Sequence, residues 1–416
     1  MPVQAGALLK IWFFTHYYPP EGNAPATRVS ALARRWVRAG HDVTVITGAP
    51  NVPDGVVYPG YRNRLCPQEE RLDGVRVVRV WTWLAPNRGA IRRIANYVSY
   101  MGSAFLWALF RRRPDVMIAT SPQFFCGWTG VLLRAFRRIP FVLEIRDIWP
   151  ESIGAVEAIR NRAVLRFLEG MERIMYRSAQ RIVTVGDGYR RRLLERGVAA
   201  DRMAVITNGV DRDLLTARPP DPGPLRRAWK LDGKFVCSYI GTIGMACGLD
   251  VLIRAGRRLR AAGRTDIVLV AVGDGAVRET LEKEAREAGL DNLIFTGRQP
   301  KETMPDFLAL SDVCLVHLRK SGLFETVLPS KIFEAAGMAR PILIGVNGDA
   351  RDLVERAGAG VAIEPEDDAA LVEALIRLAD HPEEGRAMGE KGRAYVLAHF
   401  DRDGLAEEYL KLLESL

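Results

Sequence analysis

The chain has 416 residues, of which 48% are hydrophobic and 26% are charged, a composition that excludes an intrinsically disordered protein. Its length exceeds what one hydrophobic core usually supports, so two domains are expected. The net charge of +9 is unevenly spread, because residues 1–200 carry 30 basic and 15 acidic side chains whereas the remaining residues carry 29 and 35.

Short runs rich in Val and Ile alternate with helical stretches through the first half of the chain. The predicted strands are Leu9–Phe14, Asp42–Thr47, Val75–Val80, Asp115–Thr120, Phe141–Ile145 and Arg181–Val185. Helices are predicted between several of them, at Thr27–Ala39, Phe125–Arg137 and Asn161–Arg177. Apolar strands that alternate with helices are typical of a parallel sheet covered on both faces.

The pattern restarts after a Pro/Gly-rich stretch at residues 216–234, which we interpret as a linker. The next predicted strands are Phe235–Ile240, Ile267–Val272, Leu293–Thr296, Val313–His317 and Pro341–Ile344. The predicted helices are Leu249–Ala262, Ala276–Ala288, Ser330–Gly337 and Asp368–Ala379, with two more in residues 383–416. We therefore expect an α/β protein with Rossmann-like doubly wound domains at 1–212 and 213–395, and a C-terminal helix in 396–416 that packs back on the first domain.

The five cysteines are widely separated and include no C-x-x-C pair. This spacing argues against a disulfide framework or a zinc site and is typical of a reducing compartment. The apolar run near the N-terminus is short and leads into His16-Tyr17-Tyr18-Pro19-Pro20, which predicts a buried strand with its exit loop and not a signal peptide. A cytoplasmic protein is expected.

The stretch Ile94–Phe110 is largely apolar and is flanked by arginines on both sides. It is short for a bilayer-spanning helix, which needs about 20 residues. A buried helix is the simpler interpretation, and a helix lying on an anionic membrane surface is the functional one. The basic first half fits such a partner, although solvated helix faces explain it equally well. No RNA-binding or DNA-reading motif accompanies the arginines, so nucleic acid is not expected.

Ligands of doubly wound sheets bind beyond the carboxyl ends of the strands. After the first strand, Gly22 and Asn23 precede a helix, and small residues there let backbone N–H groups approach a phosphate. The second domain opens with Gly241-Thr242-Ile243-Gly244, and its glycines do not match the G-x-G-x-x-G dinucleotide fingerprint. This mismatch disfavours a dehydrogenase without excluding diphosphate binding.

The segment 323–336 holds the richest set of candidate site residues. Pro329 suits the first turn of a helix, which puts Ser330 and Lys331 at its positive end as an anion site. Glu334 lies one turn further, where its carboxylate can accept hydrogen bonds from ribose hydroxyls, and Glu325 precedes the helix within reach of a sugar. For each residue the alternative is an ordinary polar group at an exposed helix end.

Asp147 follows a predicted strand in the run Arg146-Asp147-Ile148-Trp149-Pro150-Glu151-Ser152. Acids, an arginine and a tryptophan beside a proline form a polar corner that suits a hydroxylated ligand. A structural pair between Arg146 and Asp147 is the alternative.

Taken together, these segments resemble the family 4 glycosyltransferases of the GT-B fold, most closely the WbuB-like branch of bacterial O-antigen and capsule enzymes. The segments that carry the resemblance are His16–Gly22, Asn51–Gly55, Arg146–Ser152, Asn208–Asp211, Gly241–Gly244 and Pro329–Glu334. The resemblance implies two Rossmann-like domains that face each other across a cleft. It also implies a retaining transferase with a nucleoside-diphosphate sugar, most often a UDP-sugar, as donor, and with no metal ion or other cofactor.

The resemblance further assigns roles to individual residues. Lys331 and Ser330 would bind the diphosphate, Glu334 the ribose and Glu325 the donor sugar, while the Gly22 loop would close over the phosphates. The complete set expected at the nucleotide is Gly22, Asn23, Gly241, Thr242, Gly244, Gly297, Arg298, Ser330, Lys331 and Glu334. Without a metal, fixed cations and N–H dipoles must stabilise the leaving diphosphate, so Lys331 and the loop amides together are expected to determine the rate. The leaving phosphate oxygen would take the acceptor proton, which leaves Asp147 to orient the acceptor.

The chain departs from the family pattern at three positions. Thr326 stands where a first glutamate is usual, with Glu325 one place away; Cys247 stands for a basic or amide residue, and Asn23 for a second glycine. Cys247 and the displaced Glu325 motivate one alternative, a nucleotide-binding subunit without activity. The other alternative is a UDP-sugar epimerase on the same scaffold, because it also needs diphosphate binding and acids in the cleft. For a transferase, the expected acceptor is a saccharide or a polyprenyl-diphosphate-linked saccharide of bacterial surface polysaccharide synthesis, reached at the inner face of the plasma membrane by peripheral attachment.

Overall fold

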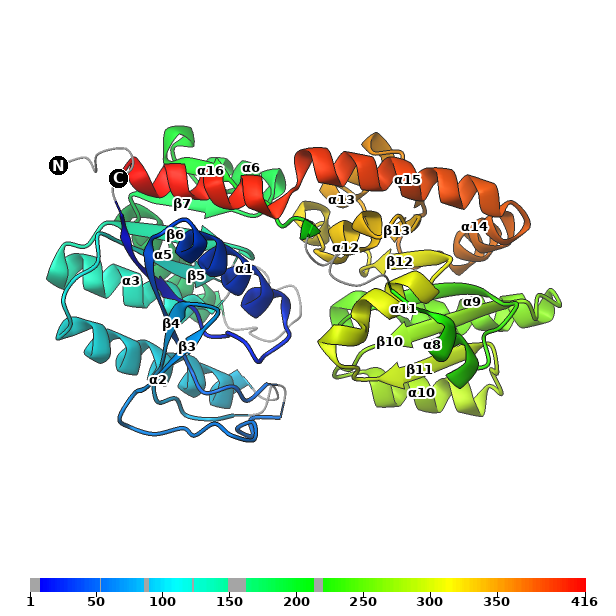
Figure 1. Cartoon of the computed structure of the whole chain (residues 1–416), viewed down its shortest axis with the longest axis horizontal. Helices are drawn as coiled ribbons and strands as arrows, with labels where there is room; N and C mark the ends of the chain where they lie inside the picture. The colour runs from blue at the N-terminus through cyan, green and yellow to red at the C-terminus, as the bar shows by residue number, and fades with distance from the viewer. Residues whose placement is uncertain (1–7, 53, 86–89, 122, 149–161, 213–219) are drawn as a thin grey trace. The chain divides into compact units, whose positions relative to one another are not determined.

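The computed structural model describes residues 8–52, 54–85, 90–121, 123–148, 162–212 and 220–416 (Figure 1). The chain divides into two compact units. Unit 1 comprises Met1–Thr207 and Arg402–Leu416, and unit 2 comprises Asn208–Asp401. The chain therefore leaves unit 1 once and returns to it with its last helix.

Unit 1 is built on one sheet with the strand order β3-β4-β2-β1-β5-β6-β7-β8. The strands are β1 Lys10–Phe14, β2 Asp42–Thr47, β3 Gln68–Leu72, β4 Val75–Arg79, β5 Val116–Ser121, β6 Phe141–Ile145, β7 Arg181–Thr184 and β8 Met203–Val205. All neighbouring strands pair in parallel except β3, which runs antiparallel to β4. The order reverses direction beside β1, so the loops after β1 and β5 meet at the carboxyl edge of the sheet.

Helices cover both faces of this sheet. They are α1 Ala24–Arg38, α2 Ala90–Leu109, α3 Phe124–Arg137, α5 Arg162–Ser178, α6 Asp187–Glu195 and α16 Arg402–Glu414. Phe13 of β1 stacks on Trp36 of α1, whereas its neighbour Trp12 contacts Trp107 of α2. Successive strand residues point to opposite faces, so α1 and α2 lie on opposite sides of the sheet. The C-terminal helix α16 joins α1, since Trp36 Nε1 donates a 3.0 Å hydrogen bond to Ala406 O.

Unit 2 has a fully parallel sheet with the order β11-β10-β9-β12-β13-β14. Its strands are β9 Phe235–Ile240, β10 Ile267–Val272, β11 Leu293–Gly297, β12 Val313–His317, β13 Ile342–Gly345 and β14 Gly360–Ala362. Its helices are α8 Gly223–Ala228, α9 Asp250–Ala261, α10 Arg278–Glu287, α11 Met304–Leu310, α12 Lys331–Gly337, α13 Asp349–Arg356, α14 Asp368–Asp380 and α15 Pro382–His399. Separate apolar clusters pack against the strands of this sheet, one with α9 and α14 and another with α12 and α13.

The α/β prediction is confirmed, and every predicted strand is present with ends that differ by one residue at most. Three strands were not predicted: the edge strands β3, β8 and β14. Helix α1 begins earlier than expected because the Asn23 side chain caps it by accepting a hydrogen bond from Ala26 N. The prediction of a linker at residues 216–234 was wrong in part, since α8 lies within this stretch. Residues 216–219 lie outside the described residues.

Helix α2 corresponds to the apolar stretch that was expected to be buried or to lie on a membrane. Tyr100 and Trp107 are buried against the sheet, whereas Leu106 and Phe110 are exposed. Among the described residues, no helix combines the length and the hydropathy that a bilayer-spanning segment requires.

Candidate functional site

Glycines bring the loops after β9 and β10 of unit 2 into close backbone contact. The Gly241 N–H donates a 2.9 Å hydrogen bond to Val272 O, and a Cβ on Gly273 would lie only 2.0 Å from Gly241 O. Similarly, a Cβ on Gly275 would lie 2.3 Å from Ile243 O. Only glycine permits this approach, and Gly241 itself has a φ of 142°. The paired loops therefore form a narrow backbone edge at the carboxyl ends of the strands, which we call the glycine edge.

Lys331, the first residue of α12, directs its ammonium group at this edge. Its Nζ lies 3.7 Å from the centre of the Tyr239 ring, and a Cβ on Gly241 would lie 2.9 Å from Nζ. Burial lowers the pKa of Lys331 to about 8. No carboxylate forms an ion pair with Lys331 in the described part of the chain, and its charged neighbour is Glu334. A desolvated cation that rests on an aromatic ring and has no anionic partner favours an anion-binding site.

Tyr239 also fixes the turn that follows β9. Its hydroxyl donates a 2.7 Å hydrogen bond to Thr242 O, and the Cys247 thiol donates to the same carbonyl at 3.2 Å. Gly244 accepts a 3.0 Å hydrogen bond from Cys247 N, which closes the short turn Met245–Cys247. Sequence reasoning identified Thr242 and Gly244 as site residues but did not identify Tyr239.

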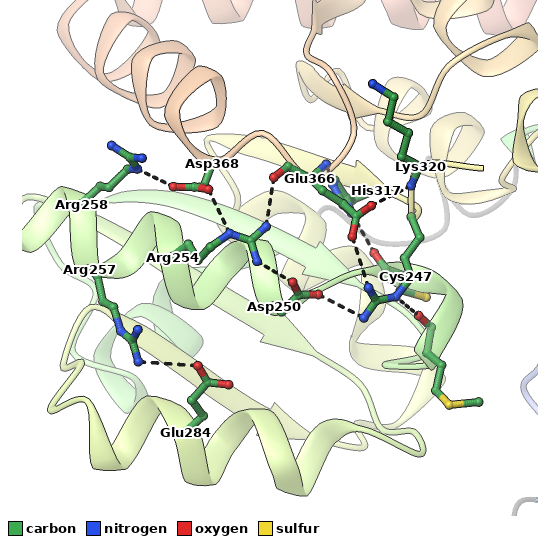
Figure 2. A network of polar contacts seen from close by, with 12 residues as sticks. Cys247, Asp250, Arg254, Arg257, Arg258, Glu284, His317, Lys320, Glu366 and Asp368 are labelled. Atoms are coloured by element: carbon green, nitrogen blue, oxygen red, sulfur yellow. Dashed lines mark hydrogen bonds and ion pairs between the residues drawn. The ribbon is translucent and has the colours of Figure 1, made fainter. Parts of the chain in front are cut away.

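His317, at the end of β12, joins this turn to the segment before α14 (Figure 2). Its Nε2 accepts a 2.8 Å hydrogen bond from the Glu366 N–H. Because a backbone N–H can only donate, Nε2 carries no proton, and Nδ1–H donates to Cys247 O at 2.8 Å. Burial lowers the pKa of His317, which keeps the ring neutral. Gly345 makes room for the ring, since a Cβ there would lie 2.4 Å from its Cδ2.

Two arginines strengthen the same connection. Arg319 Nε donates a 2.8 Å hydrogen bond to Met245 O, and its guanidinium forms ion pairs with Asp250 at 3.3 Å and Glu366 at 3.2 Å. Arg254 joins Asp250 to Asp368 across the next turn of α9, as Figure 2 shows. Hydrogen bonds from His317 and Arg319 thus fix the turn after β9, which preorganises the backbone next to Lys331.

Four more of the residues predicted for the nucleotide, Gly297, Arg298, Ser330 and Glu334, lie in unit 2. Gly297, the last residue of β11, has a φ of 68° and accepts a 3.0 Å hydrogen bond from Gly273 N, so it adjoins the glycine edge. Arg298 is exposed beside it. Ser330 occupies the N-cap position of α12 without a capping side-chain hydrogen bond, and Glu334 is exposed one turn later.

Glu325 lies in a short 3₁₀ turn, Phe324–Thr326, and its side chain is exposed. The loop before α13 packs on its backbone, because a Cβ on Gly348 would lie 2.1 Å from Glu325 O. The backbone position of Glu325 is therefore fixed while its carboxylate remains accessible.

In unit 1, the loop after β1 is fixed from inside by a buried carboxylate. Glu21 accepts hydrogen bonds from the N–H groups of Tyr18, Asn51 and Val52. Burial raises the pKa of Glu21 to about 7, although those three hydrogen bonds oppose the shift. The next residue, Gly22, is exposed at the tip of the loop.

Asn23 uses its side-chain oxygen to cap α1, where it accepts a 3.0 Å hydrogen bond from Ala26 N. A small cavity opens in the same unit, and its lining includes His16, Tyr17, Asn51, Arg93 and Tyr97.

Asp147 follows β6 and is half-buried, and its carbonyl accepts a 3.4 Å hydrogen bond from the Ser121 hydroxyl. Residues 149–152 of the same motif lie outside the described residues. Burial lowers the pKa of Arg146 to about 10, and the buried Glu144 opposes this by favouring the charged form. Glu144 also pairs with Arg28 at 3.1 Å, so a buried charge network supports this edge of the sheet.

Within the described ranges, no group of three or more His, Cys, Asp or Glu residues is arranged to hold a metal ion.

Comparison with known families matches nearly the whole chain. Residues 23–209 match the glycosyl transferase 4-like domain, and residues 224–395 match the glycosyl transferases group 1. The putative colanic acid biosynthesis glycosyl transferase WcaI of Escherichia coli K12 is 26% identical over 412 residues, which covers 97% of this chain and 99% of that protein. The probable glycosyltransferase WbjE of Pseudomonas aeruginosa is 24% identical over 302 residues, or 71% of this chain and 74% of WbjE.

Solved structures share the fold over the same extent. Anabaena HepE, crystallised in complex with UDP and glucose, superposes with a TM-score of 0.74 at 18% identity, covering 98% of this chain and 100% of that chain.

Proposed function

The chain belongs to the family 4 glycosyltransferases of the GT-B fold, and on that premise we propose that it transfers a sugar from a UDP-sugar to a saccharide or lipid-linked acceptor. The proposed pathway is the synthesis of a bacterial surface polysaccharide, in which the names of WcaI and of an O-antigen chain mannosyltransferase of Escherichia coli place those relatives. The UDP-bound HepE structures support UDP as the nucleotide.

The observation that carries the proposal is the position of Lys331. Its ammonium lies between the Tyr239 ring and the Gly241 backbone, without a carboxylate partner among the described residues. A diphosphate at this position would supply the missing negative charge. Lys331 with Ser330 is therefore proposed to bind the diphosphate, together with the backbone of Gly241, Thr242 and Gly244.

The remaining donor contacts follow from the same placement. Glu334, exposed one turn along α12, is proposed to bind the ribose hydroxyls, and Glu325 the donor sugar. The backbone of Gly297 with Arg298 is proposed to meet the base.

The residues of unit 1 are proposed to contact the phosphates and the acceptor. The loop of Gly22 and Asn23 would cover the phosphates, and Asp147 would orient the acceptor. The transfer is proposed to retain the anomeric configuration. The bond from the sugar C1 to the phosphate oxygen breaks, and the acceptor oxygen bonds to C1 on the same face. The acceptor proton passes to the leaving phosphate oxygen, and UDP departs.

Metal independence is part of the proposal, because Lys331 and fixed N–H groups can stabilise the leaving diphosphate without a divalent cation. Turnover of the purified protein should be unchanged by an excess of EDTA, and a strict requirement for added Mg²⁺ or Mn²⁺ would contradict this part.

Lys331→Met tests the site without destroying the fold. Because folding lowers the pKa of Lys331 to about 8, its charge opposes folding at neutral pH, and removal of the charge should stabilise unit 2 by about 1–3 kcal/mol. The same variant should lose UDP affinity and reduce turnover at least ~100-fold. Lys283→Met, on the exposed face of α10, is the matched control and should leave UDP binding and turnover unchanged. Wild-type UDP affinity in Lys331→Met would contradict the assignment of Lys331 to the diphosphate.

Incubation with a panel of UDP-sugars separates a transferase from the alternatives. Without acceptor, a transferase should show only slow hydrolysis, whereas an epimerase would isomerise the sugar. Mass spectrometry with soluble and lipid-linked saccharide acceptors should then reveal one added sugar. UDP binding without any product across the panel would indicate a subunit that lacks activity.

A further inference from the structure

The outward half of α2 carries an apolar stripe. Ile94, Val98 and Leu106 of α2, and Phe110 just beyond its end, are all exposed, and they follow one another at multiples of four residues, so that they form one slowly winding row along the helix. Leu106 and Phe110 expose 58% and 81% of their surface. Gly102 occupies the remaining position of the repeat, and a Cβ there would meet nothing within 4 Å. These exposed apolar side chains are not part of the hydrophobic core of unit 1.

The end of α3 extends this stripe. Phe136 is 68% exposed, and its ring lies 5.7 Å from that of Phe105 on α2. The Arg137 guanidinium donates hydrogen bonds to Ala108 O at 3.1 Å and to Arg111 O at 2.9 Å. These contacts hold the last turns of α2 and α3 together, so Phe110 and Phe136 belong to one patch.

Helix α5 continues the same layer beyond α3. The two helices pack closely, because a Cβ on Gly127 of α3 would lie 2.3 Å from the Met175 Sδ of α5. Phe167 and Ile174 of α5 are exposed. We call this surface the α2–α3–α5 face, defined by Ile94, Val98, Leu106, Phe110, Phe136, Phe167 and Ile174.

The charge of these helices is predominantly positive. Residues 90–113, 124–138 and 162–178 contain twelve arginines and two glutamates. Arg112, Arg113 and Arg138 are exposed at the end of the face where Phe110 and Phe136 lie. In unit 2, by contrast, Met245 is the one large hydrophobic residue that the described part of the chain exposes. Apolar and cationic side chains are therefore concentrated together on the α2–α3–α5 face.

We infer that the α2–α3–α5 face docks on an anionic lipid bilayer, with its aromatic and aliphatic side chains in the headgroup region and its arginines on the lipid phosphates. A second copy of the chain does not fit, because two arginine-rich faces would repel each other. A nucleic acid does not fit either, because it leaves the row of Ile94, Val98 and Leu106 unburied. This docking goes beyond the proposed sugar transfer and does not depend on the identity of the donor or acceptor.

Vesicle flotation of the full chain tests this inference without donor or acceptor. The protein should float with vesicles of phosphatidylglycerol and phosphatidylcholine, should not float with phosphatidylcholine alone, and should be released as salt rises. Leu106→Ser/Phe110→Ser and Arg112→Glu/Arg113→Glu should each weaken binding to the mixed vesicles at least ~10-fold. The controls are Leu194→Ser on α6 and Arg386→Glu/Arg393→Glu on α15, which should bind as the wild type does.

UDP affinity of each variant is measured in parallel and should be unchanged, which shows that the variants are folded and separates this inference from the donor site. The inference is overturned if the wild type ignores anionic vesicles at low salt, or if the face variants and the controls bind them equally. It is also overturned if the wild type self-associates and the face variants are monomeric, or if the face variants lose affinity for RNA or DNA and not for vesicles.

Discussion

The ammonium nitrogen of Lys331 lies 3.7 Å from the centre of the Tyr239 ring. The ring belongs to β9 and the lysine to α12, so residues almost a hundred positions apart combine at the carboxyl edge of the unit 2 sheet. The ring faces a charge that burial disfavours, and the Gly241 backbone lies beside the ammonium group.

Affinity for UDP should depend on pH through Lys331. Burial lowers the pKa of Lys331 to about 8, so the side chain is charged at pH 7 and becomes neutral as pH rises. The phosphates of UDP are almost completely ionised above about pH 7.5. Affinity should therefore begin to fall near pH 7.5, be about halved at pH 8 and then fall by up to about tenfold per pH unit, since the bound diphosphate favours the charged lysine. Isothermal titration calorimetry between about pH 7.5 and 9 measures this change.

Lys331→Met is the control for that titration. It should bind UDP weakly at every pH and should show no downward slope above pH 8. A slope of wild-type size in the variant would assign the titration to another group.

Gly241→Ala should weaken UDP binding at least ~10-fold, because the residue combines a strained φ with close contact. Its φ is 142°, and the new Cβ would lie 2.9 Å from Lys331 Nζ. Gly263→Ala is the matched variant, since Gly263 has a φ of 69° but a Cβ there would meet nothing within 4 Å. Fluorescence or calorimetric titration of both variants should show the loss in Gly241→Ala alone, and equal losses would point to backbone strain without any role for the contact.

His317 should remain neutral at pH values at which an ordinary histidine is charged. Its Nε2 accepts from Glu366 N–H, Nδ1–H donates to Cys247 O, and burial lowers its pKa. ¹⁵N NMR of the ring should show the Nδ1–H form, with a titration midpoint below about 6.5. Protonation above that value, or the Nε2–H form, would contradict the hydrogen bonds described.

The stability of unit 2 should follow from the same pKa. Folding lowers the pKa of His317. Its stabilising contribution to the free energy of unfolding is therefore complete above the pKa that His317 has in the unfolded chain, and it is lost as pH falls toward the pKa that His317 has in the folded protein. His317→Ala should cost about 1–3 kcal/mol at pH 8, since it leaves the partly buried Cys247 carbonyl and Glu366 N–H without the ring as a partner. The difference between wild type and variant, from denaturant unfolding, should shrink below about pH 6.

Glu21 should give unit 1 the opposite pH dependence. Burial raises its pKa to about 7 from 4.5, so its protonated form is favoured by folding. Relative to Glu21→Gln, the free energy of unfolding should fall as pH rises from about 4.5 to about 7, by up to about 1.4 kcal/mol per pH unit, and then level off. Glu195→Gln, on the exposed surface of α6, is the control and should run parallel to the wild type. A constant difference between wild type and Glu21→Gln across this range would mean that Glu21 is ionised throughout.

Hydrophobic patterning predicts the central strands well and the edges poorly. Buried parallel strands such as β9 and β10 are continuous apolar runs, and the sequence alone identifies them. Strand β3 has the sequence QEERL, which contains no apolar run, and its side chains form ion pairs with β4 such as Glu69 with Arg76. Helix α8 begins with a proline in its first turn inside a Pro/Gly-rich stretch, so a helix start resembles a linker.

The candidate site divides in the same way. Lys331 and Gly241 are predictable because charged and small residues in strand-to-helix loops have few structural uses. Tyr239 and His317 lie within apolar strands, where an aromatic ring or a lone histidine indicates a core residue. The place of His317 at a strand's carboxyl end was an available signal. Its contacts with Cys247 and Glu366 depend on chain segments about 50 to 70 residues away and can be found only in the folded structure.

A crystal structure of the full chain with UDP tests the central claim most directly. The account predicts oxygens of the diphosphate within about 3 Å of Lys331 Nζ, against the backbone of Gly241, with the ribose toward Glu334. UDP bound elsewhere on the protein, with Lys331 still resting on the Tyr239 ring and without an anion, would contradict it.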